Sequence, residues 1–128
     1  MREEILNWWK QSKKDFETAK HNRDSGDHYA AVFFCQQAVE KGLKALFMLK
    51  KGISSGHTHS LIFLANECGA PKNLFTFLKE LTPEFVATRY PDIVEEAPFE
   101  LYDENISYKF IKDTEVFIKW LENQIEKQ

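Results

Sequence analysis

The sequence predicts an all-α protein, an antiparallel up-down bundle of four long helices plus a short extra helix. Apolar residues recur at steps of three and four along most of the chain, which places them on one face of a helix. No stretch alternates apolar and polar residues over more than a few positions, as a half-buried strand would. The chain is 128 residues long, which predicts a single domain over residues 1–128.

Two long helices joined by a short turn are predicted in the first half of the chain. The first spans residues 3–22, and its apolar face consists of Ile5, Trp9, Phe16 and Ala19. The segment RDSGD at 23–27 breaks this helix, and its Asp27 can accept hydrogen bonds from the first backbone amides of the next helix. The second helix covers residues 27–50 and stops at Gly52. So short a connection makes the two helices antiparallel.

The second helix carries an apolar seam with a polar row beside it. The seam consists of Val32, Cys35, Val39, Gly42, Leu46 and Leu49. Next to it, Gln37, Lys41 and Lys44 follow at steps of four and three, so one strip of the helix presents a carboxamide and two ammonium groups. Such a strip could receive an anion. The alternatives are a surface ion pair between Glu40 and Lys44, and structural hydrogen bonds from a partly buried Gln37 and Lys41.

The middle of the chain predicts shorter helices. One covers residues 60–69 and ends at a glycine. Pro71 can open the next, over residues 71–81, because proline is favoured in the first helical turn. Thr82 followed by Pro83 predicts a further turn of helix with Thr82 as its N-cap. This turn should end before the next proline.

An acidic loop and a long helix complete the predicted fold. Residues 92–104 hold six acidic residues and no basic one, which predicts an irregular surface loop. The last helix begins near Asp103 and runs almost to the end of the chain. Its apolar face consists of Ile106, Phe110, Thr114, Phe117, Leu121 and Ile125.

Charge and composition exclude several classes of protein. The net charge is −3, which argues against binding nucleic acid through bulk positive charge, although a local basic strip can bind a phosphate. The two cysteines, Cys35 and Cys68, lie in apolar helical patterns, which predicts core residues in a reducing cytoplasm. The N-terminal segment has no uninterrupted apolar run, so we expect neither a signal peptide nor a membrane span, and a cytoplasmic protein.

Two histidines resemble half of a metal site. His57 and His59 could both face one ion from an extended segment. Zinc needs three or four protein ligands, and no other His or Cys cluster completes the set, so no metal and no other cofactor is predicted. The alternative is that His59 or Thr58 caps the following helix or bonds a neighbouring helix.

Several aromatic residues predict an assembly. They lie off the apolar seams of their helices and are Trp8, Phe33, Phe34, Phe47, Phe63 and Trp120. One small core cannot take all of them, so we expect another subunit to cover some. A two-fold homodimer is the simplest closed arrangement.

Three segments in this order and spacing resemble the HEPN domain family (higher eukaryotes and prokaryotes nucleotide-binding): QQAVEKGLKAL at 36–46, HTHSL at 57–61 and TRYPD at 88–92. The resemblance spans nearly the whole chain. It implies an antiparallel helical bundle, usually dimeric and often encoded beside a minimal nucleotidyltransferase. Some members of the family are ribonuclease toxins.

The resemblance also implies a nucleotide or phosphate site. Its candidate residues are Gln37, Lys41, Lys44, His59, Arg89, Tyr90 and Asp92. In such a site Arg89 would grip a phosphate while Tyr90 stacks on a base. The alternative is that Arg89 bridges to an acid within 92–104, Pro91 stiffens the turn and Tyr90 packs.

Three functions remain as hypotheses. The first is a dimeric binding module for a nucleotide or RNA, partnered by a minimal nucleotidyltransferase. The second is a metal-independent endoribonuclease toxin, in which Arg89 holds the phosphate and His59 or His28 transfers the proton. The third is a structural dimer in which the three segments only direct packing. We favour the binding module over an enzyme.

The ribonuclease branch of the family uses an arginine followed by four to six residues and then a histidine. No histidine follows Arg89 at that spacing. Arg23 and His28 satisfy it, but they lie on the wrong turn, and we interpret their spacing as coincidence.

Overall fold

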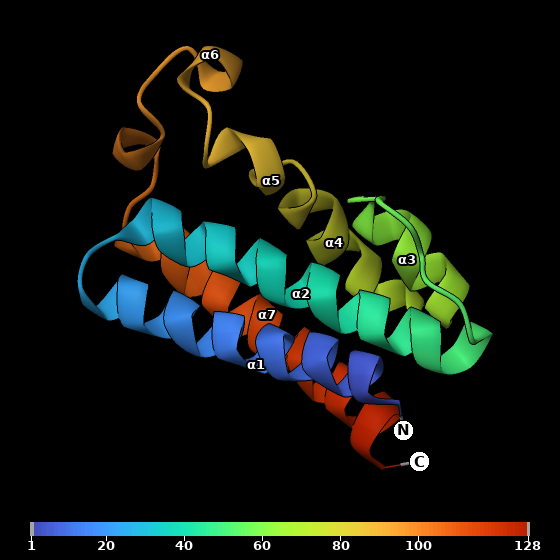
Figure 1. The fold of residues 1–128 in the computed structure, drawn as a ribbon. Coiled ribbons are helices and arrows are strands. Elements are labelled where there is room, and N and C mark those ends of the chain that lie inside the picture. The colour runs from blue at the N-terminus through green and yellow to red at the C-terminus, as the bar shows by residue number, and fades with distance from the viewer. Residues whose placement is uncertain (1, 128) are drawn as a thin grey trace.

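The computed structural model describes residues 2–127, apart from the side chains at 93 and 94, and it is all-helical over this range (Figure 1). The elements in chain order are α1 (Glu3–Asp24), α2 (His28–Lys51), α3 (Leu61–Cys68), η1 (Lys72–Leu74), α4 (Phe75–Leu81), α5 (Glu84–Ala87), α6 (Pro91–Val94), η2 (Pro98–Leu101) and α7 (Glu104–Glu126). The predicted all-α bundle is confirmed. None of these helices combines the length and apolarity needed to cross a bilayer.

The bundle has an up-down-up-down course. α1 and α2 are antiparallel, α3, α4 and α5 follow one another back along α2, and α7 then runs beside α2 until the two ends of the chain lie close together (Figure 1). Three legs are single long helices. The third leg is divided, because Gly69 ends α3 with φ 72° and Pro71 precedes the next turn.

Polar side chains cap the starts of α3 and α7, and the cap of α3 is Ser60, not His59 or Thr58, which the sequence offered as alternatives. Ser60 Oγ accepts the Phe63 amide at 3.1 Å, and Asp103 Oδ1 accepts the Ile106 amide at 2.8 Å. The predicted side-chain cap by Asp27 is wrong. Asp27 stands at the N-cap of α2, but its ψ of 70° leaves the extended range, and its side chain makes no capping hydrogen bond.

Two further local predictions need correction. Residues 92–104 are not wholly irregular, because Pro91 and Pro98 begin the one-turn helices α6 and η2. Thr82 is not the N-cap of α5, which is Pro83; the Thr82 hydroxyl donates to the Leu78 carbonyl at 2.8 Å.

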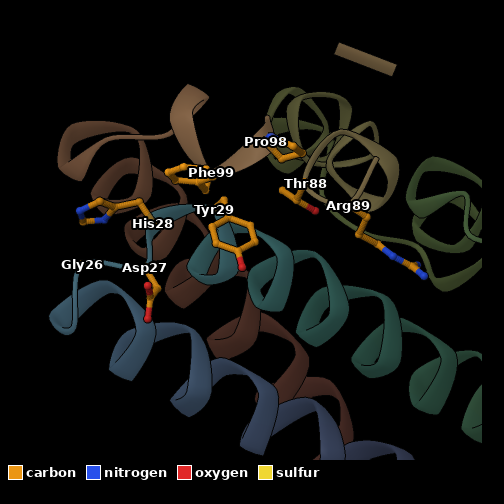
Figure 2. Close-up of a pocket in the computed structure, with 8 residues that line it drawn as sticks. All are labelled: Gly26, Asp27, His28, Tyr29, Thr88, Arg89, Pro98 and Phe99. Carbon is orange, nitrogen blue, oxygen red and sulfur yellow. The ribbon is translucent and has the colours of Figure 1, made fainter. Parts of the chain in front are cut away.

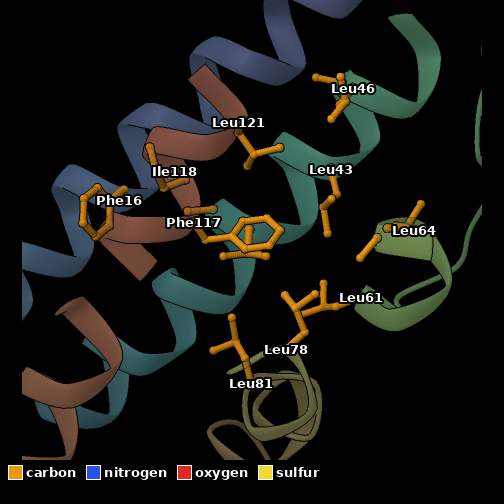
Figure 3. Packing of buried hydrophobic residues seen from close by; sticks show 14 of the residues in the cluster. Phe16, Leu43, Leu46, Leu61, Leu64, Leu78, Leu81, Phe117, Ile118 and Leu121 are labelled. Carbon is orange, nitrogen blue, oxygen red and sulfur yellow. The ribbon is translucent and has the colours of Figure 1, made fainter. Parts of the chain in front are cut away.

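The core lies where α2 meets the other three legs. Figure 3 shows leucines and a phenylalanine from α2, α3, α4 and α7 converging: Leu43, Leu46, Leu61, Leu64, Leu78, Leu81, Phe117 and Leu121. Cys35 and Cys68 are buried within it, as predicted. Burial raises the pKa of Cys35 to about 12 and that of Cys68 to about 11, so both thiols stay protonated near neutral pH.

One subunit covers more of the off-seam aromatic residues than the sequence predicts. Phe47 is buried, and Trp8, Phe34 and Trp120 are partly buried against the core. Phe63, by contrast, is 45% exposed. The expectation of a covering subunit therefore rests on fewer residues than the sequence suggests.

Candidate functional site

A buried carboxylate, Glu40 of α2, is the centre of a polar cluster. Its Oε1 accepts a hydrogen bond from Gln36 Nε2 at 3.0 Å, and its Oε2 lies 3.4 Å from Lys44 Nζ. His59 Nδ1, from the loop before α3, lies 3.1 Å from both carboxylate oxygens. An ionised carboxylate only accepts, so Nδ1 carries the proton in this contact. His59 Nε2 makes no hydrogen bond within residues 2–127.

Two of the predicted residues join this cluster on α2. Gln37 Nε2 donates to Gln36 Oε1 at 2.7 Å, and Gln36 in turn donates to Glu40. Lys44 pairs with Glu40 and lies over the Trp8 ring at 5.6 Å. The side chains of Glu40 and Lys44 are only 6% and 9% exposed. The expected ion pair between Glu40 and Lys44 is therefore present, but it is buried and does not lie on the surface.

Arg89 lies among three aromatic rings beside this cluster. Its guanidinium carbon is 5.7 Å from the centroid of Phe33, 5.0 Å from Phe85 and 5.1 Å from Tyr90. We call these three rings the aromatic cage. His59 stacks on one of them, with its ring 4.1 Å from that of Phe85 and 20° from parallel. One shared ring therefore separates His59 from Arg89.

Arg89 is exposed and makes no ion pair within the described chain. The predicted bridge from Arg89 to an acid of residues 92–104 is thus not seen among residues 2–127. Cation–π contacts hold a guanidinium over a ring without using all of its N–H donors. The site therefore presents donors that an anion can use.

Lys41 and Asp92 do not join this cluster. Lys41 Nζ binds Asp15 Oδ2 of α1 at 2.6 Å, and this buried carboxylate also accepts from Gln11 at 2.8 Å. Asp92 is exposed on α6, and no hydrogen bond or ion pair joins it to the cluster in the described part of the chain. The structure brings together Gln37, Lys44, His59, Arg89 and Tyr90 from the predicted set.

Sequence reasoning missed the residues that connect the others. Glu40 lies four positions after Gln36 and four before Lys44, so helical spacing alone places the three together, but the sequence suggests only an ion pair. Phe85 lies four positions before Arg89 across a short helical turn. No sequence signal joins His59 to either residue, since both contacts cross between segments.

A cavity of about 440 Å³ adjoins Arg89 at the end of the bundle where α1 turns into α2 (Figure 2). It is lined by Gly26, Asp27, His28, Tyr29, Thr88, Arg89, Pro98 and Phe99. The Arg89 side chain and the His28 ring point away from Tyr29 in different directions (Figure 2). The cavity therefore does not bring the guanidinium and this imidazole together.

Arg23 and His28 are both engaged by α7. Arg23 Nη2 lies 3.4 Å from Glu104, and its guanidinium lies over Tyr108 at 4.9 Å. His28 Nδ1 lies 2.8 Å from the hydroxyl of Ser107. These contacts tie the α1–α2 turn to the start of α7.

A partly buried hydrogen bond anchors the segment that carries Arg89. The Tyr102 hydroxyl donates to the Glu84 carboxylate, which joins α5 to the chain just before α7. Burial raises the pKa of the Glu84 carboxyl, and the hydrogen bond from Tyr102 opposes that change. The folded protein thus holds this proton more tightly than the unfolded chain does.

The free energy of unfolding should therefore fall as pH rises from the ordinary glutamate pKa, about 4.3, through the raised folded value. We expect Glu84→Gln to remove this loss while keeping an acceptor for Tyr102. Denaturant unfolding at about pH 4 and about pH 8 measures the change in the free energy of unfolding with pH. Relative to wild type, the variant should gain stability at the higher pH. Glu100→Gln, at an exposed position, is the control. An equal pH dependence of Glu84→Gln and wild type would contradict the prediction.

The model of the HEPN domain family matches residues 5–124 of the chain. Among solved structures, the crystal structure of TT1696 from Thermus thermophilus superposes with a TM-score of 0.87 at 24% sequence identity, covering 97% of this chain and 100% of that one. The crystal structure of ST0689, an archaeal HEPN homologue, gives a TM-score of 0.80 at 29% identity, covering 98% of this chain and 99% of that one. No functionally curated protein matches the sequence.

Proposed function

This chain belongs to the HEPN domain family, and from that premise we propose that it is a dimeric module that binds the phosphate of a nucleotide or RNA. Arg89 is the main anion ligand in this proposal. His59 lies beside it, and Gln37 and Tyr90 border the site. A minimal nucleotidyltransferase is the protein partner, as the family resemblance implies.

The observation that carries this proposal is the exposed Arg89 guanidinium in its aromatic cage, without an acidic partner in residues 2–127. A planar guanidinium offers paired N–H donors that match two phosphate oxygens. Lys44 compensates the charge of Glu40 within the cluster. The charge of Arg89 is left to attract an anion.

The remaining predicted residues take other parts in this proposal. Lys41 pairs with Asp15 and supports the α1–α2 contact. Asp92, a carboxylate, would repel a phosphate and lies outside the proposed site. The proposal is therefore narrower than the site that the sequence suggests.

Arg89→Ala should weaken binding of a short single-stranded RNA and of ATP by about tenfold or more, because a hydrogen bond to a charged group contributes about 1.5–3 kcal/mol. Arg89→Lys should recover only part of the affinity, since an ammonium lacks the paired donors. Fluorescence anisotropy and calorimetry measure both. Lys79→Ala removes one exposed positive charge from α4 and is the matched control.

Equal affinity of Arg89→Ala and wild type would reject Arg89 as the anion ligand. Loss of stability without any loss of binding would instead favour the structural dimer. Far-UV circular dichroism and thermal unfolding of each variant separate these results.

A second candidate function is the metal-independent endoribonuclease, favoured by the contact of His59 with buried Glu40 beside Arg89. Glu40 holds Nδ1, which leaves Nε2 to take the proton from a ribose 2′-hydroxyl. The 2′-oxygen would bond to phosphorus as the bond to the 5′-oxygen breaks, and that oxygen takes a proton from water. This function would be supported if the wild type cleaves RNA in the presence of a metal chelator, if His59→Ala does not, and if His57→Ala still does. An uncut RNA that binds tightly would support the binding module.

The homodimer and the partner protein are tested separately. Phe63 is 45% exposed, and a large exposed aromatic side chain favours association. Light scattering after size exclusion should give twice the 15.0 kDa chain mass. Co-purification with a tagged minimal nucleotidyltransferase from the same source tests the partnership, and a monomer that binds none would reject both.

A further inference from the structure

The cavity at the end of the bundle is lined by two exposed aromatic rings. Tyr29 lies in the first turn of α2 and is 37% exposed, while Phe99 of η2 is 62% exposed. Both lie on the same cavity as the backbone end of Arg89 (Figure 2). Aromatic faces exposed beside an arginine are the usual platform for unstacked bases. We propose that this cavity is a nucleobase subsite for a single-stranded RNA whose phosphate lies on Arg89.

The exposed Phe99 belongs to an anchored segment. Pro98 opens η2 with a fixed φ, and Tyr102 closes the segment with its hydrogen bond to Glu84. The backbone on both sides of Phe99 is thus constrained, by Pro98 before it and by Tyr102 after it, while the Phe99 ring itself remains exposed. An exposed ring on a held backbone loses little conformational entropy when a base stacks on it.

The charges around the cavity separate a base from a phosphate. Asp27 lines the cavity, and within residues 2–127 its carboxylate takes part in no hydrogen bond or ion pair. Its negative charge would repel a phosphate, whereas a carboxylate accepts hydrogen bonds from the exocyclic amine of adenine, cytosine or guanine. The Arg89 side chain points away from Tyr29 and Phe99 (Figure 2), and its guanidinium lies over the ring of Phe33 in the aromatic cage. The base would thus lie in the cavity beside Asp27, and the phosphate would lie on the Arg89 guanidinium outside it.

The spacing along α2 joins these places. Tyr29 and Phe33 are four residues apart, so they share a helix face about 6 Å apart along the axis. The first lines the cavity, and the second lies under the guanidinium of Arg89. A nucleotide with its base beside Tyr29 would therefore bring its phosphate toward Arg89. Because it names the ligand of the same site, this inference rests on the proposed function.

The test compares an eight-nucleotide oligoadenylate with inorganic pyrophosphate, which has no base. Phe99→Ala should weaken oligoadenylate binding about fivefold to a hundredfold, the range measured for losing one stacked base, and leave pyrophosphate binding unchanged. Phe99→Trp should restore the affinity. Val116→Ala trims an exposed apolar side chain of α7, outside the cavity, and should change the affinity for neither ligand. Asp27→Ala should reduce the preference for oligoadenylate over oligouridylate, since uracil has no exocyclic amine.

The outcomes separate the subsite from the anion site. If Arg89→Ala abolishes binding of both ligands but Phe99→Ala and Tyr29→Ala bind oligoadenylate like wild type, the subsite is wrong and the proposed function stands. If wild type binds neither ligand, both proposals fail. If Phe99→Ala dissociates a dimer without changing RNA affinity, the cavity belongs to a protein interface and the subsite is rejected.

Discussion

Glu40→Ala is expected to lower the free energy of unfolding by about 3–5 kcal/mol. The Glu40 carboxylate is buried and contacts Gln36, Lys44 and His59. Its removal would leave Lys44, with a side chain only 9% exposed, without a counter-charge. A buried, unpaired ammonium is among the costliest defects that a single substitution creates.

Urea unfolding followed by circular dichroism measures this loss. Glu67→Ala is the matched control, because Glu67 pairs with Lys51 at a site about two-fifths exposed and should contribute less than about 1 kcal/mol. The double variant Glu40→Leu with Lys44→Leu removes both charges and should recover much of the stability. A loss below about 1 kcal/mol for Glu40→Ala would show that Lys44 reaches water without its partner.

Gly42→Val is expected to destabilise the bundle by about 3 kcal/mol. Gly42 of α2 faces side chains of both α1 and α7. An added Cβ would stand 2.5 Å from Leu121 Cδ1, 2.9 Å from Ser12 Oγ and 3.5 Å from Trp9 Cζ3. Ser12 cannot easily move, because its hydroxyl donates to the Ala38 carbonyl at 2.6 Å. The helices would have to separate to admit the branched side chain.

A graded series at this position tests the argument. Gly42→Ala should cost less than Gly42→Val, since alanine regains about 1 kcal/mol of helix propensity. The double variant Gly42→Val with Leu121→Ala should lose less stability than the sum of the two single losses, because the smaller side chain at 121 relieves the closest contact. Thermal unfolding of wild type, the two single variants Gly42→Val and Leu121→Ala, and the double variant gives the coupling energy between positions 42 and 121. Strict additivity would place the strain elsewhere.

Part of the candidate site follows from helical spacing. The sequence predicts Gln37, Lys41 and Lys44 on one strip of α2; in the structure Gln37 and Lys44 reach the cluster through Gln36 and Glu40, which stand at helical spacing, whereas Lys41 binds Asp15. The contact of His59 with Glu40 joins a loop to a helix 19 positions away, and no local pattern encodes it. The pairing of Lys41 with Asp15 is likewise not predictable from local sequence, because it depends on how α1 packs against α2.

Short-range rules are enough to predict the long helices of this protein. The all-α class, the three long legs and the ends at Gly52 and Gly69 depend on residues within a turn or two of each other, and such interactions act in any context. The resemblance to the HEPN family, carried by the order and spacing of three motifs, is confirmed by the family model that matches residues 5–124.

The site itself depends on packing. Whether a charged residue on a helix faces water, a counter-ion or a ring is decided by the neighbouring segment, whose position follows from the fit of the whole core. Packing gave Lys41 a buried partner and left Arg89 exposed in an aromatic cage. It also placed an imidazole from the loop before α3 on a carboxylate of α2. The contacts of Lys41 with Asp15, of His59 with Glu40 and of Arg89 with Phe33 form only when the four legs are assembled, because each joins residues far apart along the chain.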